Sequence, residues 1–144
     1  MRALSIWILC LSLAAVASDE TKTPQQRVEE RQAGLNKLKE QDRAEQYAKL
    51  ALDFADLAEE QYNTGNLDAG NKSIAALVDA AKKAHTAAAM KKKKIKEAEI
   101  NLRRTVNKLD AVMRSLSQAD QDPVKKAIAE VEKARADTLE AMFK

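Results

Sequence analysis

The chain has 144 residues, with 25 Lys and Arg, 22 Asp and Glu, and a net charge of +3. This length allows one domain or two very small ones. Three glycines, two prolines and 3% aromatic residues exclude an all-β sandwich or barrel, which needs those residues in turns and strands. The abundance of Ala, Leu, Lys and Glu indicates an all-α protein.

The first residues have the pattern of a secretory signal peptide. Arg2 supplies a positive charge, residues 3–16 are mostly apolar, and Ala15-Val16-Ala17 fits a cleavage site. A membrane anchor is the weaker alternative, because a spanning helix needs roughly 20 apolar residues. We therefore expect residues 1–18 to be removed and the chain to be exported, to the periplasm or the extracellular space. The only Cys, Cys10, leaves with the signal. Small extracellular animal domains usually depend on disulfides, so a thiol-free chain favours a bacterial envelope.

Residues 19–41 are expected to form an N-terminal segment with a weakly held helix. Thr23, Pro24 and Gln26 are typical of an N-cap, a first helical position and a capping-box partner, so a helix begins here and continues to about Glu40. Gly34 and the scarcity of apolar residues weaken this helix.

Residues 42–144 are expected to form the helical domain. Asp42 caps a helix at about 42–63 that ends before Gly65. Beyond Gly70 there is no glycine, and no proline appears before Pro123. This predicts one long helix at about 67–118. A last helix follows at about 123–143. Hairpin packing is assigned to the apolar residues around the first turn, which are Tyr47, Phe54, Leu57, Tyr62, Leu67 and Ile74.

The long helix has the heptad spacing of a coiled coil, with apolar residues at steady steps of seven from Ile74 to Leu116. The two shorter helices are expected to fold back along its two halves. The predicted architecture has about four helices, arranged as elongated antiparallel hairpins placed end to end on one long central helix. A compact four-helix bundle is the alternative, and it requires a break near Met90. Because the alanine-rich surface of the long helix buries little area per residue, we also expect a homo-oligomer.

From Phe54 to Val78 the chain resembles one tetratricopeptide-type helix–turn–helix repeat. Leu57, Ala58 and Tyr62 match the first helix of such a repeat, and Gly65-Asn66-Leu67 matches its turn. No second copy follows at the expected period, so the resemblance implies a local helical hairpin and not a peptide-binding superhelix. The whole pattern is also similar to uncharacterised all-helical secreted proteins of the bacterial envelope, a likeness that implies no activity.

The sequence offers few residues that could catalyse a reaction or bind a metal ion. The single histidine, His85, lies in the alanine-rich seam of the long helix and is interpreted as a residue at the edge of that seam. Without a second His or a Cys, a zinc site of the usual kinds is excluded, and the chain has no glycine-rich phosphate loop. Carboxylate pairs such as Glu29-Glu30 occur by chance in helices this charged. We expect no enzymatic activity, cofactor or metal.

Charge is distributed unevenly. Residues 63–110 carry a net charge of +6, whereas residues 19–62 carry −4 and residues 111–144 are neutral. One interpretation is a solvated girdle that complements the acidic second helix. The other is a site for an anionic ligand. The residues expected to contact such a ligand are Lys91, Lys92, Lys93, Lys94, Lys96, Arg103 and Arg104.

The leading functional hypothesis is an exported, non-enzymatic interaction or scaffold protein with a protein partner or a second copy of itself. The first alternative is an electrostatic binder of anionic envelope polymers, polysaccharides or lipid headgroups through the lysine girdle. The second alternative is a holdase-like periplasmic chaperone. Nucleic acid is disfavoured as a partner, because the chain is expected to be exported and the basic zone has no aromatic residue for base stacking.

Overall fold

The computed structural model describes residues 21–144, which contain helices and no strand, so the predicted all-α class is confirmed. The elements are α1 (Pro24–Leu35), η2 (Glu40–Asp42), α2 (Ala44–Asn63), α3 (Leu67–Lys91), α4 (Ile95–Ser115), η3 (Gln118–Asp120) and α5 (Asp122–Ala141). The predicted signal peptide, residues 1–18, lies outside the described residues.

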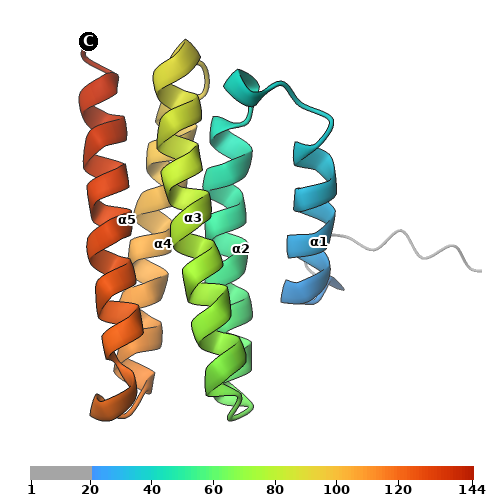
Figure 1. The fold of residues 1–144 in the computed structure, drawn as a ribbon, viewed down its shortest axis with the longest axis vertical. Coiled ribbons are helices and arrows are strands. Elements are labelled where there is room, and N and C mark those ends of the chain that lie inside the picture. Colours follow the sequence, from blue (N-terminus) through green and yellow to red (C-terminus); the bar gives the residue numbers. More distant parts are fainter. Residues whose placement is uncertain (1–20) are drawn as a thin grey trace, which may run out of the picture.

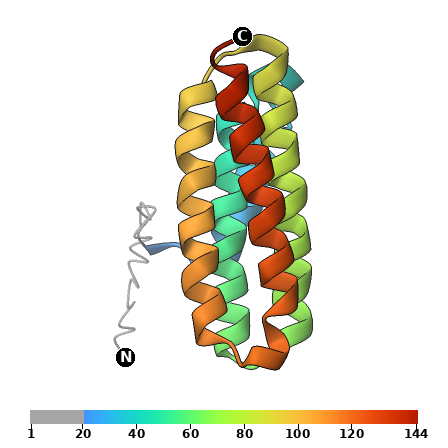
Figure 2. The same ribbon diagram turned by 90° about the vertical axis from the view of Figure 1, so that its left-hand side faces the viewer.

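Helices α2 to α5 form a four-helix bundle, and α1 lies against α2 outside the bundle (Figures 1 and 2). The chain makes two antiparallel hairpins, α2–α3 and α4–α5. Helix α2 packs on α3 and α4, and helix α5 packs on the same two helices. Helices α3 and α4 therefore occupy opposite corners of the bundle. The prediction of hairpins placed end to end is wrong, because the two hairpins lie side by side.

The predicted long helix at 67–118 is also wrong, because it is divided into α3 and α4 by a turn at Lys92, Lys93 and Lys94. Lys92 has φ 54° and Lys94 has φ 61°, both in the left-handed region. This conformation costs roughly 1–2 kcal/mol for a residue with a Cβ, which is why glycine usually occupies it.

The break allows the apolar faces of both α3 and α4 to be buried in one core. Leu77 and Ala84 of α3 and Leu102 and Leu109 of α4 are all fully buried. In a continuous helix, each half could pack against only one short helix. Folding back at the lysine turn lets α3 and α4 each pack against both α2 and α5, so one core forms within a single chain.

Replacing Lys92 by glycine is expected to raise the free energy of unfolding by about 1 kcal/mol, because glycine adopts the left-handed conformation without the Cβ clash. Urea denaturation of the variant and the wild type measures the change. In a continuous helix the same substitution would lower stability by about 1 kcal/mol, since glycine is a poor helix former. A decrease would therefore contradict the turn and support the long helix.

Helix α1 begins as predicted and ends earlier. The Thr23 hydroxyl accepts a hydrogen bond from the Gln26 amide, and the Gln26 side chain accepts one from the Thr23 amide, which completes the capping box. The helix ends at Leu35 instead of near Glu40. Only Val28 and Leu35 of α1 are buried, so its apolar contact with the bundle is small.

Candidate functional site

The lysine turn lies at one end of the bundle. The same end carries η2, the first turn of α2, the first turn of α4 and the last turn of α5 (Figure 1). We call this the basic end. The sequence predicted that Lys91 to Lys94 lie along the side of a long helix. In the structure they lie at the end of the bundle, and each of the four side chains is exposed.

Three of the four lysines form ion pairs with Asp42 of η2 or Glu45 in the first turn of α2. Lys91 Nζ lies 3.4 Å and Lys93 Nζ 3.7 Å from Oδ1 of Asp42, and Lys94 Nζ lies 3.8 Å from Oε2 of Glu45. The lysine side chains in these pairs are 46–57% exposed. The carboxylates are only 19–25% exposed, but the pairs are long and open to solvent on the lysine side, so each contributes roughly 0–1 kcal/mol.

Lys92 and Lys96 differ from their neighbours. Within residues 21–144, neither side chain has an ion-pair partner, and both are exposed. Lys92 is held in the left-handed turn, while Lys96 lies in the first turn of α4. These two lysines are therefore the uncompensated positive charges of the lysine cluster.

Arg103 and Arg104 lie along α4, more than a turn beyond the basic end, so the structure does not bring them together with the four lysines. Arg103 donates hydrogen bonds to both carboxylate oxygens of Glu99, at 3.3 and 2.6 Å. Arg104 is exposed and has no ion-pair partner among the described residues. A contact of Arg103 and Arg104 with an anionic ligand therefore stays a prediction, and it would need a ligand that extends from the basic end along α4.

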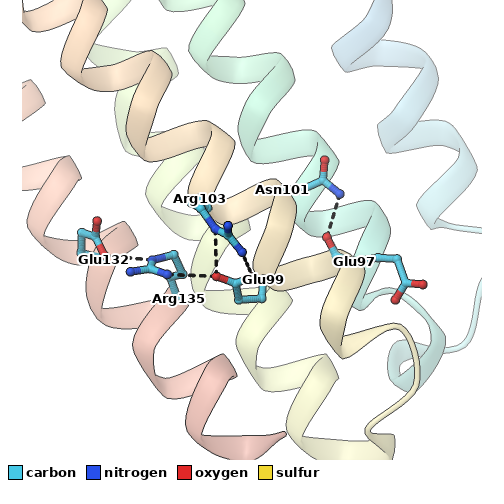
Figure 3. A network of polar contacts seen from close by, with 6 residues as sticks. All are labelled: Glu97, Glu99, Asn101, Arg103, Glu132 and Arg135. Atoms are coloured by element: carbon cyan, nitrogen blue, oxygen red, sulfur yellow. Dashed lines mark hydrogen bonds and ion pairs between the residues drawn. The ribbon is translucent and has the colours of Figure 1, made fainter.

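Glu99 joins α4 to α5 through the polar network in Figure 3. Its side chain is buried, and Arg135 of α5 donates a hydrogen bond of 2.9 Å to its Oε1. Arg135 also bonds Glu132 at 3.0 Å. The hydrogen bonds from Arg103 and Arg135 hold the pKa of Glu99 below its usual value, although burial acts to raise it. This network is structural, since its charges are satisfied by one another.

The acidic face of α2 is compensated within the chain. Lys108 of α4 pairs with Glu59 and Asp56, and Arg31 of α1 pairs with Asp53. Burial raises the pKa of Asp53, while the bond from Arg31 opposes that rise. The interpretation that basic residues of the middle region complement the acidic second helix is confirmed for Lys94 and Lys108.

The predicted hairpin residues form a real helical hairpin. Five of the six are buried, and these are Tyr47, Phe54, Leu57, Tyr62 and Ile74. Leu67 is 39% exposed, so it packs less completely than the other five. It is the first residue of α3 and follows the Gly65 turn, where φ is 81°, so it lies at the rim of the bundle.

His85 belongs to α3, and its ring faces α5, with Nδ1 3.5 Å from the Thr138 hydroxyl. In the part of the chain that the structure describes, no group of three or more His, Cys, Asp and Glu side chains is placed to hold a metal ion. None of the helices within residues 21–144 is long and apolar enough to cross a membrane.

No protein-family model, curated protein or solved structure matches this chain. Function therefore has to be inferred from the geometry of the basic end. Sequence reasoning missed Asp42 as the partner of the lysines and Lys144 as a further cation at this end. Four consecutive lysines were the available signal, but only the fold places the end of α5 beside them (Figure 2).

Proposed function

We propose that the chain is an exported, non-enzymatic helical module that binds a polyanion through the basic end of its bundle. The observation that carries the proposal is the composition of the α3–α4 turn. Two of its lysines occupy left-handed positions at which glycine would be more stable. Strained backbone of this kind concentrates at functional sites, and it persists where the surrounding structure imposes it.

The charges at this end support binding to a ligand with several negative groups. Lysine ammonium groups on flexible stems reach phosphate or carboxylate groups without a fixed geometry. Lys92 and Lys96 need no rearrangement to do so, and the weak pairs of Lys91 and Lys93 with Asp42 can be exchanged for a ligand. Binding of this kind is long-ranged and sensitive to salt.

Scaffolding through an elongated helical surface has less support. That hypothesis relied on an elongated surface along one long helix, whereas the chain reverses at Lys92 to Lys94 and the described helices form a four-helix bundle with α1 beside it. The homo-oligomer stays a prediction. A holdase would need an extended apolar surface for unfolded clients, whereas the exposed large hydrophobic residues within residues 21–144 are only Leu67, Met90, Leu139 and Phe143.

Neutralising Lys92 and Lys93 together with glutamine is expected to weaken binding to soluble linear polyphosphate about 30-fold at low salt. Each lysine near an anionic surface contributes about 1 kcal/mol, which corresponds to a factor of about five in affinity. Glutamine keeps the size of the side chain and the backbone strain, so only charge changes. Titration calorimetry on the chain from residue 19, the form that the predicted cleavage leaves, measures the affinity.

Lys125 and Lys126 provide the matched control. They are exposed residues of the first turns of α5, at the opposite end of the bundle, and they form no ion pair with any described residue. Replacing both by glutamine makes the same change in net charge. Equal losses in the two double variants would indicate binding to net charge alone and would contradict a site at the basic end, as would a wild type that does not bind.

A further inference from the structure

Exposed apolar side chains gather at the basic end. Within residues 21–144, the exposed large hydrophobic residues are Leu67 (39%), Met90 (56%), Leu139 (39%) and Phe143 (83%). Met90 is the residue before the four lysines, while Leu139 and Phe143 lie at the end of α5. Three of the four therefore lie at the end of the bundle that carries the lysine turn, and only Leu67 lies at the other end.

The end of α5 brings apolar and basic residues together. Leu139 lies in the last turn of α5, and Phe143 follows two residues after the helix ends at Ala141. Figure 2 shows the C-terminus beside the turn that joins α3 and α4. A depression between the two helix ends is lined on the α3 side by His85, Ala89 and Lys92, and on the α5 side by Asp137, Glu140, Ala141 and Lys144.

The carboxylates at this end neutralise some of its cations and leave others without a partner. The ion pairs are Asp42 with Lys91 and Lys93, Glu45 and Glu97 with Lys94, Glu40 with Arg43, Asp137 with Lys133, and Glu140 with Lys144. The surface that remains available combines the unpaired Lys92 and Lys96 with bare apolar side chains. Soluble polyphosphate or polysaccharide gains nothing from Met90 and Phe143, whereas a lipid headgroup layer accommodates both kinds of group.

We infer that the polyanion is the surface of an anionic lipid bilayer, which the basic end contacts with its lysines while Met90 and Phe143 enter the headgroup region. This inference rests on the proposed function and adds the identity of the ligand. The lysines supply attraction to phosphate groups, and the two apolar side chains supply affinity that salt does not screen. The bundle then stands on the membrane surface by its basic end.

Vesicle binding tests the inference with a soluble polyanion as the reference. The chain from residue 19 is sedimented with vesicles of equal parts phosphatidylglycerol and phosphatidylcholine, and with phosphatidylcholine alone. Replacing Met90 and Phe143 together by serine is expected to weaken binding to the anionic vesicles about tenfold. Binding to linear polyphosphate is expected to stay unchanged. Leu67→Ser is the matched control, because Leu67 is exposed at the opposite end, and it is expected to leave vesicle binding unchanged.

A fluorescent reporter locates the contact directly. The only Trp is Trp7, so Phe143→Trp introduces a single indole into the chain from residue 19. Its emission is expected to shift to shorter wavelength on anionic vesicles and to be quenched by brominated lipid, whereas Leu67→Trp shows neither effect. Since Phe143 follows the end of α5 and is 83% exposed, the substitution leaves the core intact.

The outcomes separate the two proposals. Intact polyphosphate binding, combined with vesicle binding that is absent or insensitive to the double serine substitution, overturns the lipid inference and leaves polyanion binding standing. An unshifted Phe143→Trp emission on vesicles that do bind the protein also overturns the lipid inference. Failure of the wild type to bind either probe overturns both.

Discussion

Replacing Gly70 by alanine is expected to lower the free energy of unfolding by about 2 kcal/mol, although alanine is the better helix former. A Cβ at Gly70 would lie 2.5 Å from Tyr62 Cδ1 and 2.8 Å from Tyr62 Cζ, far inside van der Waals contact. The ring cannot move away easily, because Tyr62 is buried and its hydroxyl donates a hydrogen bond of 2.8 Å to Asn71 Oδ1.

The effect of Gly70→Ala on the free energy of unfolding is expected to change sign when Tyr62 is also replaced. In a Tyr62→Ala variant the obstacle is gone, so Gly70→Ala is expected to stabilise the protein by about 0.5–1 kcal/mol, as in an ordinary helix interior. Gly34→Ala serves as a control in the wild type, since a Cβ there meets nothing within 4 Å. Urea denaturation of the series measures each change. Destabilisation by Gly70→Ala in both backgrounds would show that the close approach of Tyr62 is not the cause.

Replacing Arg135 by methionine is expected to lower the free energy of unfolding by about 2 kcal/mol at neutral pH. Glu99 is only 5% exposed, and the substitution removes the arginine that connects it to α5. A buried carboxylate that loses a partner retains its desolvation cost. Replacing Glu99 by methionine in the same chain is expected to restore most of the loss, because the buried charge is then gone. A double variant no more stable than Arg135→Met would contradict this account.

The stability contributed by the Glu99–Arg135 ion pair is expected to decrease as the pH falls. The pKa of Glu99 is lowered in the folded protein, so its ion pairs stabilise the fold above the carboxyl's unfolded pKa of about 4.3. That stabilisation is lost as the pH falls through the lowered folded pKa. The difference in stability between the wild type and Arg135→Met is therefore expected to narrow as the pH falls from 7 to below 4. A difference that stays constant over this range would mean that Glu99 does not carry the effect.

Local sequence signals predicted most of the helices but not the division of the longest one. Thr23, Gly65 and Pro123 mark helix boundaries by chemistry that acts within a few residues, so the elements they delimit were located closely. The break at Lys92 to Lys94 has no such signal, because lysine is a good helix former. It is decided by contacts of α3 and α4 with helices distant in the sequence, and periodicity does not report those contacts.

For the candidate site too, the sequence identified the lysines but not the residues that the fold places around them. Composition identified the lysine run, and the structure retains Lys91 to Lys94 and Lys96 at one end of the bundle. Arg103 belongs to a different environment, because its partner Glu99 lies one turn away on α4. The end of α5 lies beside the lysine turn (Figure 2) because of the arrangement of the hairpins, so no pattern along the chain could reveal this proximity.

The most direct test of binding at the basic end is a two-dimensional NMR titration of the chain from residue 19 with linear polyphosphate. The account predicts that the largest shifts of backbone amide signals occur at residues 91–96, with none above background at Lys125 and Lys126. At high salt these shifts are expected to disappear, because the contact is electrostatic. Shifts centred on the opposite end, or spread evenly over the exposed lysines, would contradict the account.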